Sequence, residues 1–267
     1  NTAVGTDALT ANTTGTQNTA LGLGSLGANT TASFNTAVGY NAGVANTTGT
    51  KNAFFGSYTG DANTDGDNNT AIGQAALSAN TTGGNNTALG NDALISNTTA
   101  SDGTAVGYQT LYSNTTGANN TAMGRKALYT NTTGDNNVGI GYNSLFYNTT
   151  GADNSALGTN ALQANTTGNY NSAFGRQALL SNTTAENNVA VGYQAGYSTT
   201  TSGTNTSVGS SALYSNTTGY GTASLGWEAL YSNTTGALNV ATGRQSLRSN
   251  TTGSNNTASG YRALYSN

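Results

Sequence analysis

Large apolar residues recur along the chain every 17 residues, each time within the same polar framework. From Asn1 the chain divides into fifteen complete units and a partial one over 256–267, without insertion or deletion. The fourth position of the unit is large and apolar in fourteen copies, and the ninth is Leu in thirteen. Small residues dominate the third and eighth positions. A fixed period of this kind is typical of repeat architectures, so we expect residues 1–267 to form a single domain.

The unit reads N-T-A-(V/L)-G-x-x-A-L-x-x-N-T-T-G-x-N. Its T-A-V segment predicts a short strand at positions two to four, for example 2–4 and 19–21, with the second and fourth side chains on one face and Ala on the other. Gly follows in every copy, and we expect it to end the strand in a conformation closed to other residues. Among these glycines are Gly5, Gly22, Gly39, Gly73, Gly107, Gly124 and Gly226.

A second short strand is expected around the Leu of the ninth position, represented by Leu111 and Leu128. N-T-T-G-x-N then turns the chain back. Helical repeats need about 33 residues, and the chain contains no Asn-Gly dipeptide of the type that closes antiparallel hairpins. The pattern therefore predicts an all-β fold, a parallel β-solenoid in which each 17-residue unit is one coil.

Stacked coils place equivalent residues above one another at about 4.8 Å. The Asn of the twelfth position, as in Asn12, Asn29 and Asn114, is expected to form an amide ladder. The fourth and ninth positions are expected to form two buried apolar seams. Such a core is thin, and Leu is replaced by Gly at 43, 60 and 196. We therefore expect several chains to associate laterally through the small residues of the third and eighth positions.

Composition restricts the chemistry that the chain can perform. It contains no Cys and no His, which removes thiol chemistry and imidazole bases, and charged residues make up only 6% with a net charge of −3. We expect no enzyme activity, no cofactor, no bound nucleic acid and no insertion into a membrane, because no apolar run approaches the roughly 20 residues that span a bilayer. The chain starts at a repeat boundary without Met, which suggests a processed product or a segment of a longer fibre.

One segment is similar to a calcium-binding loop. The stretch DANTDGD at 61–67 matches the opening of an EF-hand and offers Asp61, Asn63, Asp65 and Asp67 as ligands. Ile72 stands where the loop needs its bidentate Glu, and Asn63 is also the Asn that fifteen of the sixteen repeats place there. We therefore expect an acidic variant of the turn and treat the calcium site as a weak candidate.

Aromatic residues gather at the sixth and tenth positions of the unit. Rows of exposed rings could bind a glycan or a protein on a host surface, whereas packing within the assembly, including cation–π contacts with Arg125, Arg176 and Arg244, is the plainer interpretation. The receptor-site candidates are Tyr108, Tyr112, Tyr142, Tyr193, Trp227 and Tyr231.

The recurring N-T-T segment is an acceptor pattern for N-linked sugars, and its hydroxyls also suit O-linked sugars. Asn and Thr in a turn equally serve local hydrogen bonding, and we consider this structural use the main one. The candidate glycan-bearing residues are Asn114, Thr115, Thr116, Asn131, Thr132, Thr133, Asn216, Thr217 and Thr218.

N-T-A-V-G at 1–5 and 35–39, N-S-A-L-G at 154–158 and N-S-A-F-G at 171–175 resemble the N-S-x-A-(I/V)-G signature of trimeric autotransporter adhesin heads. Repeat regions of phage tail fibre proteins are similar. The resemblance implies a left-handed parallel β-roll in a homotrimer, displayed on a cell or virion surface and used for attachment.

The sequence thus predicts an extracellular structural or adhesive fibre whose main partner is itself. A glycan-coated filament or a virion fibre with a mechanical role is the alternative. An ice-binding solenoid is a minor alternative, because ice-binding surfaces favour T-x-T on one face whereas the adjacent Thr residues of N-T-T point in opposite directions if they are extended.

Overall fold

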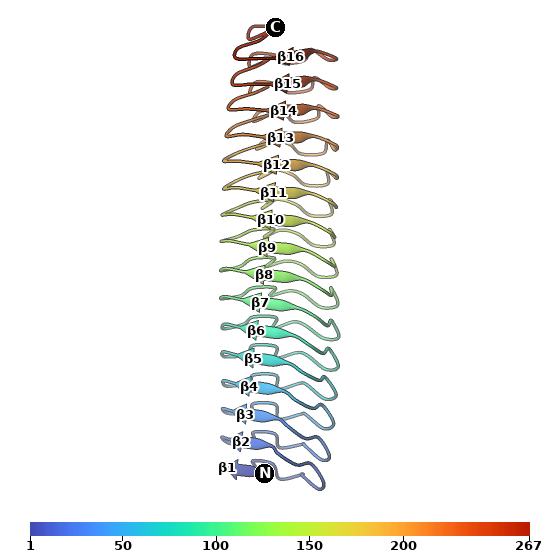
Figure 1. Cartoon of the computed structure of the whole chain (residues 1–267). Coiled ribbons are helices and arrows are strands. Elements are labelled where there is room, and N and C mark those ends of the chain that lie inside the picture. Colours follow the sequence, from blue (N-terminus) through green and yellow to red (C-terminus); the bar gives the residue numbers. More distant parts are fainter. The chain divides into compact units, whose positions relative to one another are not determined.

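The computed structural model describes all residues, 1–267, in two compact units that comprise 1–136 and 137–267. The boundary falls between the eighth and ninth sequence repeats. Each unit is a parallel β-solenoid with one strand per coil, and within a unit each strand pairs in register with the strands of adjacent coils (Figure 1). Thr19, for example, pairs with Thr36, 17 residues on. The prediction of an all-β parallel β-solenoid with 17-residue coils is confirmed.

The strands occupy the second to fourth positions of each repeat, as expected. In the first unit they are β1 (Thr2–Val4), β2 (Thr19–Leu21), β3 (Thr36–Val38), β4 (Ala53–Phe55), β5 (Thr70–Ile72), β6 (Thr87–Leu89), β7 (Thr104–Val106) and β8 (Thr121–Met123). In the second unit they are β9 (Val138–Ile140), β10 (Ser155–Leu157), β11 (Ser172–Phe174), β12 (Val189–Val191), β13 (Thr206–Val208), β14 (Ala223–Leu225), β15 (Val240–Thr242) and β16 (Thr257–Ser259).

The glycine after each strand has the predicted role. Its φ lies between 118° and 141° in all sixteen coils, a region that residues with a side chain rarely adopt. A Cβ on Gly22 would also lie 2.4 Å from the carbonyl oxygen of Gly39 in the next coil. Close backbone approach therefore adds to the conformational requirement.

The second strand that we predicted around the ninth position is absent. Leu26 and Leu111 lie in turns with φ of 49° and 53°, in the left-handed region. Their side chains are nevertheless fully buried, and the backbone still bonds between coils, since Leu26 N donates to Ala42 O at 3.0 Å. Burial of the side chain offsets a conformation that costs most residues about 1–2 kcal/mol.

The prediction of two buried apolar seams is half wrong. The Leu column of the ninth position is buried, but the large residues of the fourth position point outward, and Ala of the third position points into the coil. Ile72 is 44% exposed whereas its neighbour Ala71 is fully buried. The small residues of the third and eighth positions are consequently interior and cannot mediate contact between chains.

The interior is too narrow for a second large column. In the fourth coil Phe54 replaces the usual Ala of the third position, and Gly43 and Gly60 replace the Leu of two successive coils. A Cβ on Gly60 would lie 2.5 Å from the Phe54 ring, and one on Gly43 would lie 2.8 Å from it. One buried phenyl ring therefore occupies the space that two leucines occupy elsewhere.

Two columns of buried Asn supply the polar part of the interior. At the twelfth position, Asn29 Nδ2 donates to Asn12 Oδ1 at 2.9 Å and to Ala32 O at 3.1 Å. At the first position, Asn18 Oδ1 accepts the backbone N–H of Asn35 at 2.9 Å. The predicted ladder at the twelfth position is confirmed, and the second column was not predicted. No helix long and apolar enough to cross a bilayer occurs in the structure.

Candidate functional site on the outer surface of the coils

The strand face of each unit carries an outward column of large apolar side chains, the fourth-position column. In the first unit Leu21, Phe55 and Ile72 are 47%, 38% and 44% exposed. In the second unit Leu157 and Leu225 are 46% and 52% exposed. Contiguous exposed apolar surface of this kind marks interaction sites in folded proteins.

The aromatic residues of the tenth position form stacks along the coils. Tyr197, Tyr214 and Tyr231 lie face to face with centroid distances of 4.9 and 5.1 Å and interplanar angles of 10° and 7°. In the first unit Tyr112 and Tyr129 stack at 5.0 Å. Burial, and then its ring neighbours, raise the pKa of Tyr214 above its ordinary value. These rings mainly pack on one another.

At the sixth position, aromatic rings are more exposed and arginines cover their faces. The Arg125 guanidinium lies 5.9 Å from the Tyr108 ring, and that of Arg244 lies 4.7 Å from the Trp227 ring. Tyr108, Trp227 and the candidates Tyr142 and Tyr193 are 40–45% exposed. The cation–π packing that the sequence suggested is thus present, and part of each ring still faces solvent.

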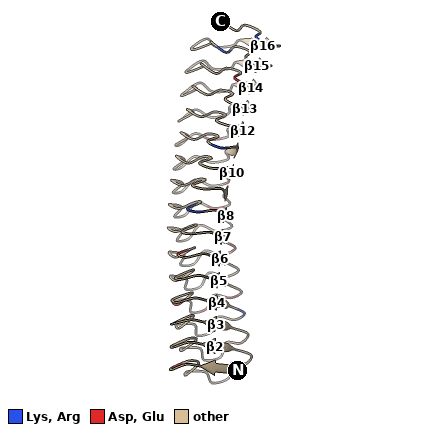
Figure 2. Cartoon of the chain, turned by 90° about the vertical axis from the view of Figure 1, so that its left-hand side faces the viewer, with Lys and Arg blue, Asp and Glu red and all other residues tan.

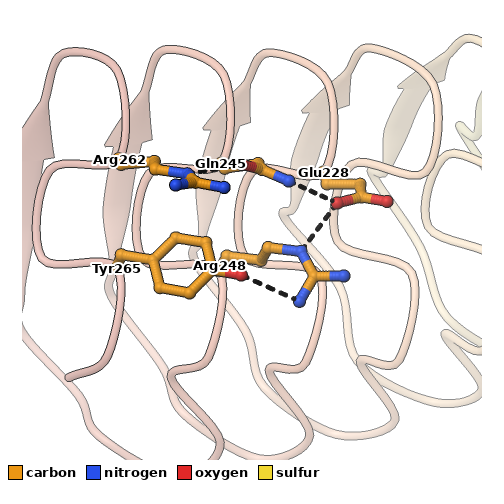
Figure 3. A network of polar contacts seen from close by, with 5 residues as sticks. All are labelled: Glu228, Gln245, Arg248, Arg262 and Tyr265. Carbon is orange, nitrogen blue, oxygen red and sulfur yellow. Dashed lines mark hydrogen bonds and ion pairs between the residues drawn. The ribbon is translucent and has the colours of Figure 1, made fainter.

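A polar network links the last three coils of the second unit (Figure 3). Glu228 accepts hydrogen bonds from Arg248 Nε at 2.6 Å and Gln245 Nε2 at 3.0 Å, and Arg262 Nε donates to Gln245 Oε1 at 3.0 Å. Burial alone would raise the pKa of Glu228, but the bonds from Arg248 and Gln245 outweigh it and hold the pKa below its usual range. Sequence reasoning missed this network, although Glu228, Gln245 and Arg262 follow one another at intervals of 17 residues.

Charge differs between the two units, although charged residues are sparse throughout (Figure 2). The first unit has three basic and seven acidic residues, and the second has four basic and three acidic. Arginines of the second unit lie against rings, whereas acids of the first unit mostly accept hydrogen bonds from hydroxyl, amide or backbone groups, as Asp67 does from Thr50 N at 2.6 Å.

The calcium candidate is divided between the inside and the outside of its coil. Asn63 is buried, and its amide donates to Asn46 Oδ1 at 2.8 Å within the ladder, while Asp65 and Asp67 are exposed on the surface. Asp61 accepts a hydrogen bond from Ser78 at 2.5 Å. Nowhere do three or more His, Cys, Asp or Glu residues lie together as a metal site would require.

The N-T-T segments are also divided. The amides of Asn114, Asn131 and Asn216 are buried, and Asn131 Nδ2 donates to Asn114 Oδ1 at 2.7 Å. The folded coil therefore leaves no room for a sugar on these nitrogens. Thr115 and Thr217 are half-buried and bond the next coil's carbonyl, whereas Thr116, Thr133 and Thr218 are exposed. Of this group, only the last Thr of N-T-T is well exposed for O-linked modification.

The surface has no pocket that would enclose a small molecule. What it offers is a long apolar strip and rows of rings, which suit extended partners better than small substrates. Comparison with family models, curated proteins and solved structures gives no significant match to the chain.

Proposed function

We propose that the chain is part of an extracellular structural and adhesive fibre without catalytic activity, in which copies of the chain associate side by side. The observation that carries this proposal is the exposed fourth-position column. Side-by-side packing of these columns would bury the large apolar residues that the narrow coil interior excludes. Three copies are the expected number, from the resemblance of the repeats to trimeric adhesin heads.

The arrangement of the remaining surface supports an attachment role. Ring and arginine columns occupy the sixth and tenth positions of the coil and are distinct from the fourth-position column through which we expect the copies to associate. A glycan-coated filament or virion fibre remains the second candidate, favoured by the exposed hydroxyls of Thr116, Thr133 and Thr218. In that case the surface threonines carry sugars and the role is mechanical.

The test compares the native mass of the protein with the 26.6 kDa of its chain. We expect about three times the chain mass for the parent and dissociation for Ile72→Lys, because a charge in the fourth-position column cannot be buried without a partner. Gln74→Lys is the matched control, since residue 74 lies in the same coil and is exposed outside that column.

A monomeric parent would refute association. Dissociation of both variants would show that added charge, not the position, is responsible. The mass of the denatured chain, produced in its native host, separates the two candidates, because additional hexose-sized increments indicate the coated filament.

A further inference from the structure

The second unit has a break in its outer column of large side chains at Ser210. Along the sixth position of coils 11 to 15 the residues are Arg176, Tyr193, Ser210, Trp227 and Arg244. This is the only place in either unit where a small residue stands between two aromatic residues of this column. Tyr193 is 45% exposed and Trp227 is 40% exposed.

The tenth position of the same coils shows how much room the break leaves. There Tyr197, Tyr214 and Tyr231 fill three successive coils with rings at 4.9 and 5.1 Å. One ring therefore occupies one coil spacing. The backbones of Tyr193 and Trp227 are two coil spacings apart, about 9.6 Å, and Ser210, in the coil between them, carries no ring.

The outer sides of this break are closed by arginine. Arg176 lies 5.9 Å from the Tyr193 ring, and Arg244 lies 4.7 Å from the Trp227 ring. Each aromatic residue is therefore covered on the side away from Ser210 and supported in place. The two guanidinium groups also disfavour a cationic ligand between the rings.

Polar groups lie beside the break. Arg262 contacts both Tyr261 and Tyr265, at 5.4 and 5.1 Å, which places the seventh-position column between the sixth and the tenth. In coil 13 the residue of that column is Ser211, and Glu228 belongs to the same column in coil 14. A ligand seated over Ser210 would therefore meet aromatic faces on two sides and hydroxyl and carboxylate groups along one edge.

We propose that Tyr193, Ser210 and Trp227 form a binding site for one pyranose ring of a neutral glycan. The aliphatic C–H faces of a sugar ring suit the electron-rich faces of aromatic side chains, and its hydroxyls suit the serines. The site lies on an open surface, so a single ring is expected to bind with a Kd on the order of 1 mM. Repeated copies in a fibre would raise the avidity. The proposal deepens the adhesive function and rests on it.

The experiment uses the full chain on an array of defined neutral and carboxylated oligosaccharides, followed by titration of the best ligand. Trp227 is the only Trp in the chain, so its fluorescence reports on the site directly. We expect binding to change this fluorescence and Ser210→Tyr to weaken binding at least tenfold. Tyr already occupies the sixth position in several coils, so this variant should fold normally.

Ser57→Tyr is the matched control, because Ser57 holds the same position but has an aromatic neighbour in that column on one side only. It should bind like the parent. Equal binding by Ser210→Tyr and the parent, or no binding by the parent, would overturn the site. The adhesive function would fail separately, through a parent that neither assembles nor attaches to any surface.

Discussion

Two of the regions that depart from the repeat in the coil interior, one in each unit, are accommodated differently. Around Phe54 in the first unit, an oversized ring is matched by two glycines. Around Thr199 in the second unit, the ladder Asn is replaced, and the buried atoms Asn182 Oδ1 and Thr199 Oγ1 are left without a hydrogen-bond partner. The extra volume of Phe54 is fully compensated by the two glycines, whereas the loss of the ladder Asn at Thr199 is only partly compensated.

The partial compensation comes from Ser202. Asn216 would donate to an Asn at 199, and instead its Nδ2 reaches Ser202 Oγ at 3.2 Å. The donor is thus satisfied, whereas the acceptor on Asn182 is not. Apolar packing requires only that total volume be kept, but a hydrogen-bond ladder requires a donor and an acceptor at each step. A substitution that breaks the ladder should therefore be harder for neighbouring residues to compensate than one that changes the volume of an apolar side chain.

The largest expected effect comes from removing the ring that fills the first unit. Phe54→Ala should destabilise its coils by about 3–5 kcal/mol, because it leaves a cavity that no neighbouring side chain fills. Hydrogen exchange of the amides in coils three and four measures this loss locally.

The rescue variant combines Phe54→Ala with Gly43→Leu and Gly60→Leu. Both glycines have φ near the leucine values of other coils, 58° and 56°, so leucine should fit once the ring is gone. Protection close to that of the parent is expected. A triple variant as weakly protected as Phe54→Ala would contradict the view that volume alone is being exchanged.

An intermediate effect is expected from repairing the ladder in the second unit. Thr199→Asn together with Ser202→Gly restores the usual residues and gives Asn182 Oδ1 a donor. The gain should be about 1–3 kcal/mol, the cost of the unsatisfied buried groups that it removes. Thermal unfolding of this double variant should be compared with Thr201→Asn, an exposed control in the same coil. A double variant no more stable than the control would show that the orphaned atoms cost little.

The smallest effect concerns Glu228. This charged residue also departs from the repeat, but it has hydrogen-bond partners in Arg248 and Gln245. Its lowered pKa means that the stabilisation is present above about pH 4.3, the ordinary Glu value, and is lost as pH falls through the folded-state pKa. The side chains of Arg248 and Glu228 are 27% and 15% exposed. Because solvent screens such a pair, we expect it to contribute no more than about 1 kcal/mol to the free energy of unfolding.

Glu228→Gln should therefore lower the melting temperature more at pH 7 than at pH 3. Glu186→Gln is the control, since Glu186 is exposed and accepts from an amide, Asn169 Nδ2, at 2.9 Å. An equal loss at both pH values would mean that the charge of Glu228 is not what stabilises these coils.

The repeat alone predicted the 17-residue coil, the parallel stacking, the glycine that ends each strand and the Asn ladder. It did not predict which strand face is inside. Alternation places Thr36 and Val38 opposite Ala37, but only the width of the coil decides between the two faces. The space beside Leu26 and the Asn columns admits Ala and excludes Val. The limited width of the interior is visible in the sequence where the larger Phe54 occurs together with Gly43 and Gly60 in place of two leucines.

The surface was harder to predict than the interior. The sequence showed that aromatic residues recur at the sixth and tenth positions. Their packing on arginines and on one another depends on side-chain direction, which the sequence does not show. The turn around Leu111 was assigned to a strand because Leu gives no signal of left-handed backbone, whereas the Asn, Asp and Gly residues at the seventh and seventeenth positions do.

The ladder also has a direction. Each amide nitrogen donates toward the preceding coil, as Asn46 does to Asn29 and Asn80 does to Asn63, so the side-chain dipoles of a column add instead of cancelling. A row of this kind has a positive pole toward its first coil and a negative pole toward its last. In the second unit the substitution at Thr199 ends one row with the uncompensated carbonyl oxygen of Asn182 as its negative pole. The solenoid interior is therefore electrically polarised although it contains no charge.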